Sequence, residues 1–235
     1  HKVYGASIIT SVTAQNTTGV KGIYDLPVDF VEKQIDAVIK DIGFNSVKIG
    51  MLSNKDIINL VSEKIKQFDL KNIVLDPVMV ATSGDKLLLD DSINALKTDL
   101  IPLADLITPN IYEAKLLSGL EISSVENMKE AADKLIKLGC KYVLIKGGHL
   151  TKSDYSIDIL YDGIKFTQYE SKRIDTQNTH GTGCTYSSAI EANLAKGLDM
   201  KKAVENAKEY ITIAISNSFN IGKGHGPLNH FWNLK

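Results

Sequence analysis

Short apolar runs of strand length alternate with segments of helical periodicity from one end of the chain to the other, and no other feature restricts the fold as strongly. Such alternation is typical of a mostly parallel sheet covered by helices, so the sequence predicts an α/β protein. The expected strands cover residues 6–12, 46–49, 72–75, 105–107, 142–145, 157–161 and 164–169. The last two flank Asp162-Gly163, which predicts an antiparallel hairpin with an Asp-Gly turn.

Apolar residues at helical spacing predict helices between and after these strands. One covers residues 31–39, and another starts near Ser124 and ends at Gly139. Two more are expected over residues 184–195 and 200–217. No linker or repeat interrupts the series, so 235 residues with 43% hydrophobic content predict one domain with one full-sized core.

Charge and composition exclude several classes of partner. The 27 basic and 28 acidic side chains give a net charge of −1, and Arg173 is the only arginine, so we expect no binding to nucleic acid. No apolar run is long enough to span a bilayer. Two cysteines, Cys140 and Cys184, are too few for a disulfide framework. We therefore expect a cytoplasmic protein that does not enter membranes.

The strongest local motif is the glycine-rich run His180-Gly181-Thr182-Gly183-Cys184, which leads into a predicted helix. Such a turn leaves backbone N–H groups unpaired at the positive end of a helix dipole, where they suit a phosphate oxygen or a developing anion. An ordinary glycine loop before a buried helix is the alternative that the motif alone leaves open. Its spacing matches neither the dinucleotide nor the Walker A fingerprint.

Further segments occur along almost the whole chain: VYGASIIT (3–10), TAQNT (13–17), KIGML (48–52), DPVMVATSG (76–84), TPNIYEA (108–114), KGGHL (146–150), NTHGTGCT (178–185) and GHGPLNHF (224–231). In this order they resemble the hydroxymethylpyrimidine and phosphomethylpyrimidine kinases of thiamine biosynthesis, a branch of the ribokinase-like superfamily. The resemblance implies a ribokinase-like three-layer sandwich, with a mostly parallel central sheet and helices on both faces. It also implies that residues 1–235 form one kinase domain that lacks roughly thirty of the family's first residues.

The resemblance implies that ATP is the phosphoryl donor and Mg²⁺ the metal. The backbone amides of Gly181 to Cys184 would then stabilise charge on the transferred phosphoryl group, and the ammonium of Lys146 would contact phosphate oxygens. Many ribokinase-like sugar kinases have an aspartate base where this chain has Cys184. A helix N-terminus can lower the pKa of a thiol, and bound phosphate opposes this. We expect Cys184 to be catalytic, with a small buried space-filling residue as the alternative.

Two carboxylates follow predicted strands, where ligands bind in open α/β sheets. Asp76 follows an apolar run and precedes a proline, while Asn110 and Glu113 follow the next strand. The resemblance places all three near Mg²⁺ and the phosphates, with Asp76 and Glu113 as metal ligands, often through water. A turn-forming aspartate and a glutamate in the first turn of a helix, favoured there by the helix dipole, are the alternatives.

The resemblance also implies residues for the two substrates. Gln15 would pair with a ring nitrogen and exocyclic amine of an aminopyrimidine, because an amide offers both a donor and an acceptor. Met79 and Gly50 would line this site, with core packing as the alternative for Met79. The positions expected at the nucleotide and its phosphates are Asn110, Thr179, His180, Thr182 and Lys208.

The expected reaction is the ATP-dependent phosphorylation of 4-amino-5-hydroxymethyl-2-methylpyrimidine, and then of its monophosphate, by a homodimer. A pyridoxal kinase of the same branch is the nearest alternative, since it phosphorylates a hydroxymethyl group on a pyridine. A ligand-binding relative without turnover is the alternative from another class.

Overall fold

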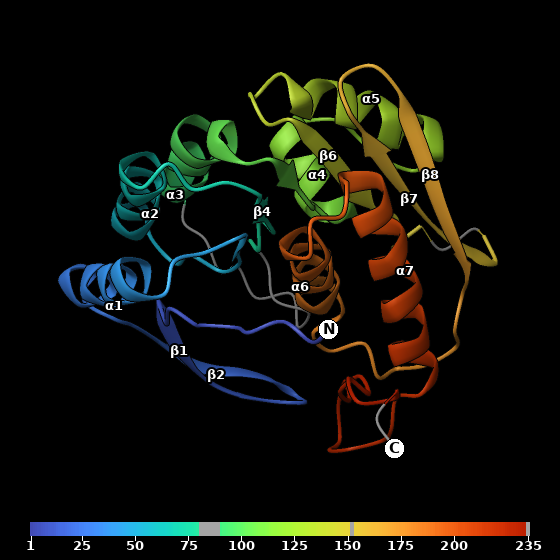
Figure 1. The fold of residues 1–235 in the computed structure, drawn as a ribbon. Coiled ribbons are helices and arrows are strands. Elements are labelled where there is room, and N and C mark those ends of the chain that lie inside the picture. Colours follow the sequence, from blue (N-terminus) through green and yellow to red (C-terminus); the bar gives the residue numbers. More distant parts are fainter. Residues whose placement is uncertain (80–89, 151–152, 234–235) are drawn as a thin grey trace.

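A six-stranded sheet in the order β3-β4-β5-β6-β7-β8 forms the centre of the computed structural model, which describes residues 1–79, 90–150 and 153–233 (Figure 1). The first four strands are parallel: β3 (Val47–Ile49), β4 (Ile73–Leu75), β5 (Leu106–Ile107) and β6 (Tyr142–Lys146). The last two, β7 (Tyr155–Tyr161) and β8 (Phe166–Lys172), join antiparallel. The sheet is therefore mostly parallel, as predicted.

Helices cover both faces of this sheet because successive side chains of each buried strand point to opposite sides. Val74, Leu106 and Leu144 pack against α6 (Thr182–Ala195) and α7 (Met200–Ser216). Their neighbours on the other face pack with α2 (Lys55–Gln67), α4 (Ile111–Ser118) and α5 (Val125–Ile136). The result is the three-layer sandwich that the sequence predicts.

The remaining helical segments lie at one end of the sheet. α3 (Asp90–Ala95) continues into two short turns over Leu96–Leu100 and Ile101–Leu103, and α1 (Val28–Asp41) packs on α2 through Val31, Ile35 and Leu60. No helix in the described ranges is long and apolar enough to cross a membrane.

Most predicted boundaries hold to within two residues, because the capping chemistry is local. The side chain of Ser124 accepts from the N–H of Asn127 at the start of α5, and Gly139, with φ of +108°, ends the turn after it. The predicted helix over residues 184–195 begins two residues earlier, at Thr182.

The predicted strand over residues 6–12 is wrong for residues 6–10. The backbone N–H and carbonyl of Ile9 pair with the side-chain amide of Gln34 at 3.0 and 2.9 Å, instead of with a neighbouring strand. Regular structure starts with β1 (Ser11–Asn16), which pairs antiparallel with β2 (Gly19–Asp25) in a separate two-stranded sheet. This hairpin, which carries Gln15, was not predicted from the sequence.

The predicted β7–β8 hairpin is confirmed, but its turn is longer than Asp162-Gly163. Tyr161 pairs with Phe166, and the carboxylate of Asp162 accepts from the N–H groups of Ile164 and Lys165. The second strand therefore begins at Phe166 instead of at Ile164.

Candidate active site

Three parallel strands end at one buried ion pair. Asp76 follows β4 and is only 1% exposed, while Lys146 is the last residue of β6. Oδ1 of Asp76 accepts from Nζ of Lys146 at 2.7 Å and from the hydroxyl of Thr108, just after β5, at 2.9 Å. Oδ2 accepts from the hydroxyl of Ser187 on α6 at 3.3 Å. The edge of the sheet and the first turns of α6 are thus held together by one carboxylate.

Both members of this pair are charged at neutral pH. Burial alone would raise the pKa of Asp76, but the charges of Lys146 and Lys48, with the hydrogen bonds from Lys146 and Thr108, hold it below its ordinary value. Burial likewise opposes the charge on Lys146, but the charges of Asp76 and Glu113 raise its pKa above the ordinary lysine value. A fixed positive charge therefore lies at the carboxyl edge of the sheet.

Glu113 and Asn110 form a capping box at the start of α4. Oε2 of Glu113 accepts from the N–H of Asn110 at 2.8 Å, and the Asn110 side chain accepts from the N–H of Glu113 at 3.0 Å. Glu113 is thus the first-turn helix carboxylate that the sequence left open, and it also caps the helix. Burial raises the pKa of Glu113 to about 7; the charge of Asp76 also raises it, and that of Lys146 lowers it. Glu113 is therefore poised between its neutral and charged forms.

The glycine-rich turn brings the N-terminus of α6 against this ion pair. Gly181 has φ of +79° as the N-cap residue, a conformation that favours glycine. A Cβ on Gly183 would lie 3.1 Å from Nζ of Lys146, so only glycine allows this approach without displacement. The N–H of Thr182 donates to the carbonyl of Thr179, but within the described ranges the N–H groups of Gly183 and Cys184 have no acceptor. Two backbone donors and one ammonium therefore converge, which is an anion site.

Cys184 lies at this site and is an exposed residue, whereas Cys140 is buried. The space-filling alternative is therefore wrong for Cys184. Desolvation by surrounding protein atoms raises the pKa of the thiol; Asp76 adds to this, and the cations Lys48 and Lys146 only partly oppose it. The lowering of the pKa that a helix N-terminus suggested is not found. Cys184 is a neutral thiol at neutral pH.

The sequence of this chain matches a known protein family. The model of the family described as phosphomethylpyrimidine kinase matches residues 1–229. This chain belongs to that family. The match confirms the resemblance seen in eight segments of the sequence, and with it a kinase of the ribokinase-like fold class.

Individual members of the phosphomethylpyrimidine kinase family, and proteins of known structure, are similar to this chain over most of its length. The hydroxymethylpyrimidine/phosphomethylpyrimidine kinase of Bacillus subtilis is 46% identical over 229 residues, which are 97% of this chain and 84% of that protein. The phosphomethylpyrimidine kinase of Clostridium difficile has a TM-score of 0.81 at 43% identity, covering 91% of this chain and 87% of that one. The ADP complex of a Bacillus subtilis pyridoxal kinase has a TM-score of 0.92 at 41% identity, covering 99% and 89%.

The other residues predicted at the phosphate end of this kinase differ in their surroundings. Thr179 and Thr182 lie at the turn, where the Thr182 hydroxyl donates to the Thr179 carbonyl at 2.7 Å. The backbone N–H of His180 donates to the carbonyl of Gly226 at 3.1 Å. Lys208 is 8% exposed, and its ammonium donates to Asp158 at 2.7 Å. Thr179, His180 and Thr182 thus lie at the turn that forms the anion site, whereas Lys208 forms an ion pair with Asp158.

The Lys208–Asp158 pair supports the turn after Lys146. The other oxygen of Asp158 accepts from the N–H of Gly147 at 2.9 Å, and Asp158 pairs with Lys146 across β6 and β7. A Cβ on Gly147 would overlap the carbonyl of Ile157. The glycine therefore lets the chain pass close to β7.

The residues predicted for the acceptor divide into two groups. Gln15 is exposed on β1, and Gly50 follows β3, where a Cβ would lie 2.5 Å from Nζ of Lys48. Met79 is 1% exposed and belongs to the main core, which is the packing role left open for it. The Val80 and Ser83-Gly84 parts of the same motif lie outside the described residues.

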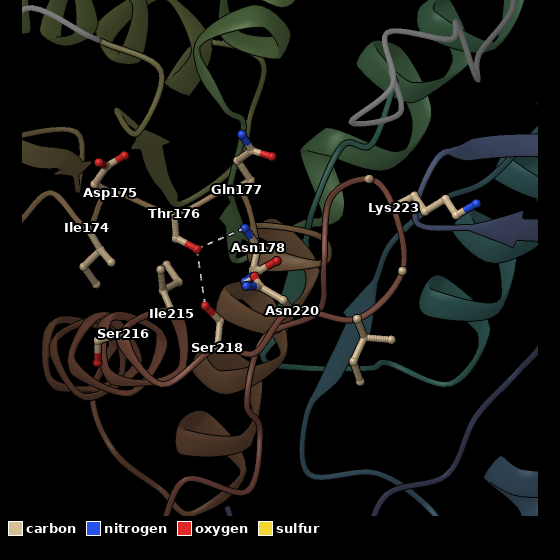
Figure 2. Close-up of a pocket in the computed structure, with 13 residues that line it drawn as sticks. Ile174, Asp175, Thr176, Gln177, Asn178, Ile215, Ser216, Ser218, Asn220 and Lys223 are labelled. Atoms are coloured by element: carbon tan, nitrogen blue, oxygen red, sulfur yellow. Dashed lines mark hydrogen bonds between the residues drawn. The ribbon is translucent and has the colours of Figure 1, made fainter.

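An open polar pocket of 660 Å³ lies beside the loop that leads into α6 (Figure 2). Residues 174–178 line it, together with Ile215 and Ser216 at the end of α7, Ser218 and residues 220–224. Its wall continues directly into Thr179 and His180, so the pocket and the anion site share one loop.

Sequence reasoning missed four residues of this site: Lys48, Thr108, Ser187 and Asp158. Lys48 and Thr108 were both within recognised motifs, and Thr108 directly follows a strand, a signal that could have found it. Ser187 and Asp158 are identified only by contacts between distant parts of the chain.

Proposed function

We propose that this chain transfers a phosphoryl group from ATP to the 5-hydroxymethyl group of 4-amino-5-hydroxymethyl-2-methylpyrimidine, and then a second one to the monophosphate. The observation that carries the proposal is the meeting of the Lys146 ammonium with the free N–H groups of Gly183 and Cys184. The printed name of the Bacillus subtilis relative, hydroxymethylpyrimidine/phosphomethylpyrimidine kinase, supports this choice of acceptor.

Phosphoryl transfer asks a protein mainly to position the reactants and to stabilise charge. Lys146 uses one proton on Asp76 and retains two for phosphate oxygens, while the N–H groups of the anion site receive negative charge on the transferred group. The thiol of Cys184 is protonated before substrates bind. It would lie next to the acceptor oxygen as a catalytic group. The second transfer needs no base, because its acceptor is already an anion.

The donor chemistry of Asp76 and Glu113 fits Mg²⁺. This ion prefers carboxylate and phosphate oxygens and keeps several waters, so two carboxylates that already accept hydrogen bonds can hold it through water. When bound, it would neutralise charge on the phosphates. A nearby cation would also favour the charged form of Glu113.

The remaining parts of the proposal concern the acceptor and the assembly. Gln15 would recognise the aminopyrimidine edge, and Gly50 would border the ring. Lys208 would influence the nucleotide through Asp158 and Gly147 instead of by direct contact. We further propose one kinase domain that works as a homodimer in the cytoplasm.

Pyridoxal is the second candidate acceptor. The observation that favours it is the TM-score of 0.92 to a pyridoxal kinase, which shows how similar the frameworks of the two activities are. Both acceptors are flat nitrogen heterocycles with a hydroxymethyl group, so only turnover separates them.

The deciding experiment offers the pyrimidine and pyridoxal side by side with ATP and Mg²⁺ and identifies the products by mass. Two phosphates on the pyrimidine support the proposal, one phosphate on pyridoxal moves the acceptor to the second candidate, and no turnover of either favours a binding protein. The variant Gln15→Ala should raise the KM for the pyrimidine and leave that for ATP unchanged. Gln168→Ala, an exposed strand glutamine on β8, is the matched control.

A further inference from the structure

A glycine-rich stretch near the end of the chain passes between two functional loops at very short range. We call residues 220–226 the clasp; they include glycines at 222, 224 and 226. A Cβ on Gly222 would overlap the side chain of Thr17, and one on Gly224 would overlap its backbone. A Cβ on Gly226 would overlap the side chain of Asn178. The spacing of the three glycines thus follows from contact with the β1–β2 turn on one side and the β8–α6 loop on the other.

Hydrogen bonds attach the clasp to the turn of the hairpin. The hydroxyl of Thr17 accepts from the N–H groups of Lys223 at 3.2 Å and Gly224 at 3.3 Å. The carbonyl of Thr17 accepts from the N–H of His225 at 2.9 Å. Figure 1 shows the tip of the hairpin directed toward this part of the chain. A single threonine therefore holds three consecutive residues of the clasp.

A second set of hydrogen bonds attaches the clasp to the loop that leads into the anion site. The amide of Asn178 donates to the side chain of Asn220 at 2.8 Å, and the two side chains lie together in Figure 2. A ring nitrogen of His225 lies 3.1 Å from the carbonyl of Gln177. The N–H of His180 donates to the carbonyl of Gly226 at 3.1 Å. The bonded loop ends one residue before Gly181.

We propose that the clasp is a positioning element of the phosphoryl transfer. It fixes the hairpin that carries Gln15 relative to the turn of Gly181 to Cys184, and so aligns the acceptor with the phosphoryl group. The inference rests on the proposed function, because Gln15 is the acceptor residue there. Thr17 is two residues from Gln15, and small displacements of an aligned group are costly in phosphoryl transfer. Thr17 and Asn178 are therefore positioning residues that need not touch either substrate.

Each side of the clasp has its own kinetic test. Thr17→Val removes the hydroxyl acceptor at nearly constant shape, so the KM for the acceptor should rise about five- to tenfold while that for ATP changes less than about twofold. Thr17→Ser keeps the hydroxyl and should restore the wild-type value. Gly226→Ala displaces Asn178 and should raise the KM for ATP instead. Gly22→Ala on β2, where a Cβ meets only Ala14 at 3.9 Å, is the matched control.

Amide hydrogen exchange of residues 11–25 supplies a readout that needs no substrate. Exchange should be faster in Thr17→Val than in the wild type, Thr17→Ser and Gly22→Ala. Unchanged exchange, or equal kinetic effects of Thr17→Val and Thr17→Ser, would overturn the positioning role. A wild-type protein that fails to phosphorylate the pyrimidine, yet shows the faster exchange in Thr17→Val, would contradict the proposed function and leave the clasp's hold on the hairpin intact.

Discussion

Replacing Glu113 by glutamine should change the pH dependence of stability in a calculable way. Glu113 is 4% exposed, and its pKa rises from the ordinary value of 4.5 to about 7 in the folded protein. Glutamine has nearly the same shape and can still accept the N–H of Asn110, but it carries no charge. The variant therefore isolates the cost of ionising this buried carboxyl group.

The sign follows from proton binding. Between pH 4.5 and 7 the folded state holds a proton on Glu113 that the unfolded state has lost, so stability falls as pH rises through this window. The rise of the Glu113 pKa from 4.5 to about 7 corresponds to about 3 kcal/mol when the group is fully ionised. At pH 5 most of that cost is absent, so the stability of Glu113→Gln relative to the wild type should increase by about 2–3 kcal/mol from pH 5 to pH 8.

Urea unfolding of both proteins at several pH values, in a chelator to keep cations away, measures this difference. Groups other than Glu113 titrate in both proteins, so their contributions largely cancel in the difference between the two unfolding free energies. The altered hydrogen bond adds a constant to this difference and does not affect its slope with pH. Parallel curves for the two proteins between pH 5 and 8 would refute the reasoning, because they would mean that Glu113 is ionised with an ordinary pKa. In that case the charge of the neighbouring Lys146 would fully offset the effect of burial on the pKa of Glu113.

Three further predictions concern other parts of the site. Cys184→Ala should lower turnover with no loss of thermal stability, and full activity would leave the thiol without a chemical role. Gly147→Ala should lower the free energy of unfolding by about 1–3 kcal/mol, because its Cβ would overlap β7. In Gly148→Ala the new Cβ makes only a 3.8 Å contact, so the free energy of unfolding should stay within about 0.5 kcal/mol of the wild type in the same assay. Lys208→Met should cost about 3–5 kcal/mol by leaving Asp158 buried without its partner, and the added change Asp158→Asn should recover most of this loss if the charge is its cause.

The layers of this fold could be predicted because strands and helices with one buried face carry that face in their residue pattern. Val74 and Leu75 point to opposite faces of the sheet and are both completely buried, so the run that contains them reads as a strand without any alternation. The β1–β2 hairpin lacks such a signal because nearly all of its residues are exposed. Its strands pair with each other, and its turn bonds to the clasp, and no local pattern in the sequence indicates either contact.

The candidate site could be predicted where chemistry and strand ends coincide, as at Asp76 and Lys146. Contacts over long sequence distances were out of reach: Ser187 is 111 residues from Asp76, and Thr17 is more than 200 residues from the clasp. The resemblance placed Lys208 at the nucleotide, but its ammonium donates to the buried Asp158. A sequence pattern shows which groups are available and leaves open which partner each one finds.

The hydrogen bonds around Asp76 explain how a kinase of this kind can keep a buried cation ready for phosphate. An ammonium with no partner would lose its proton when buried, and one enclosed by carboxylates would have no donors to spare. Thr108 and Ser187 also donate to Asp76, so its oxygens do not depend on Lys146 alone. Lys146 therefore remains charged while it donates to Asp76, and its ammonium still lies close to Gly183. Removing either hydroxyl should strengthen the hold of Asp76 on Lys146 at the expense of phosphate, which makes these neutral groups part of the electrostatics of the site.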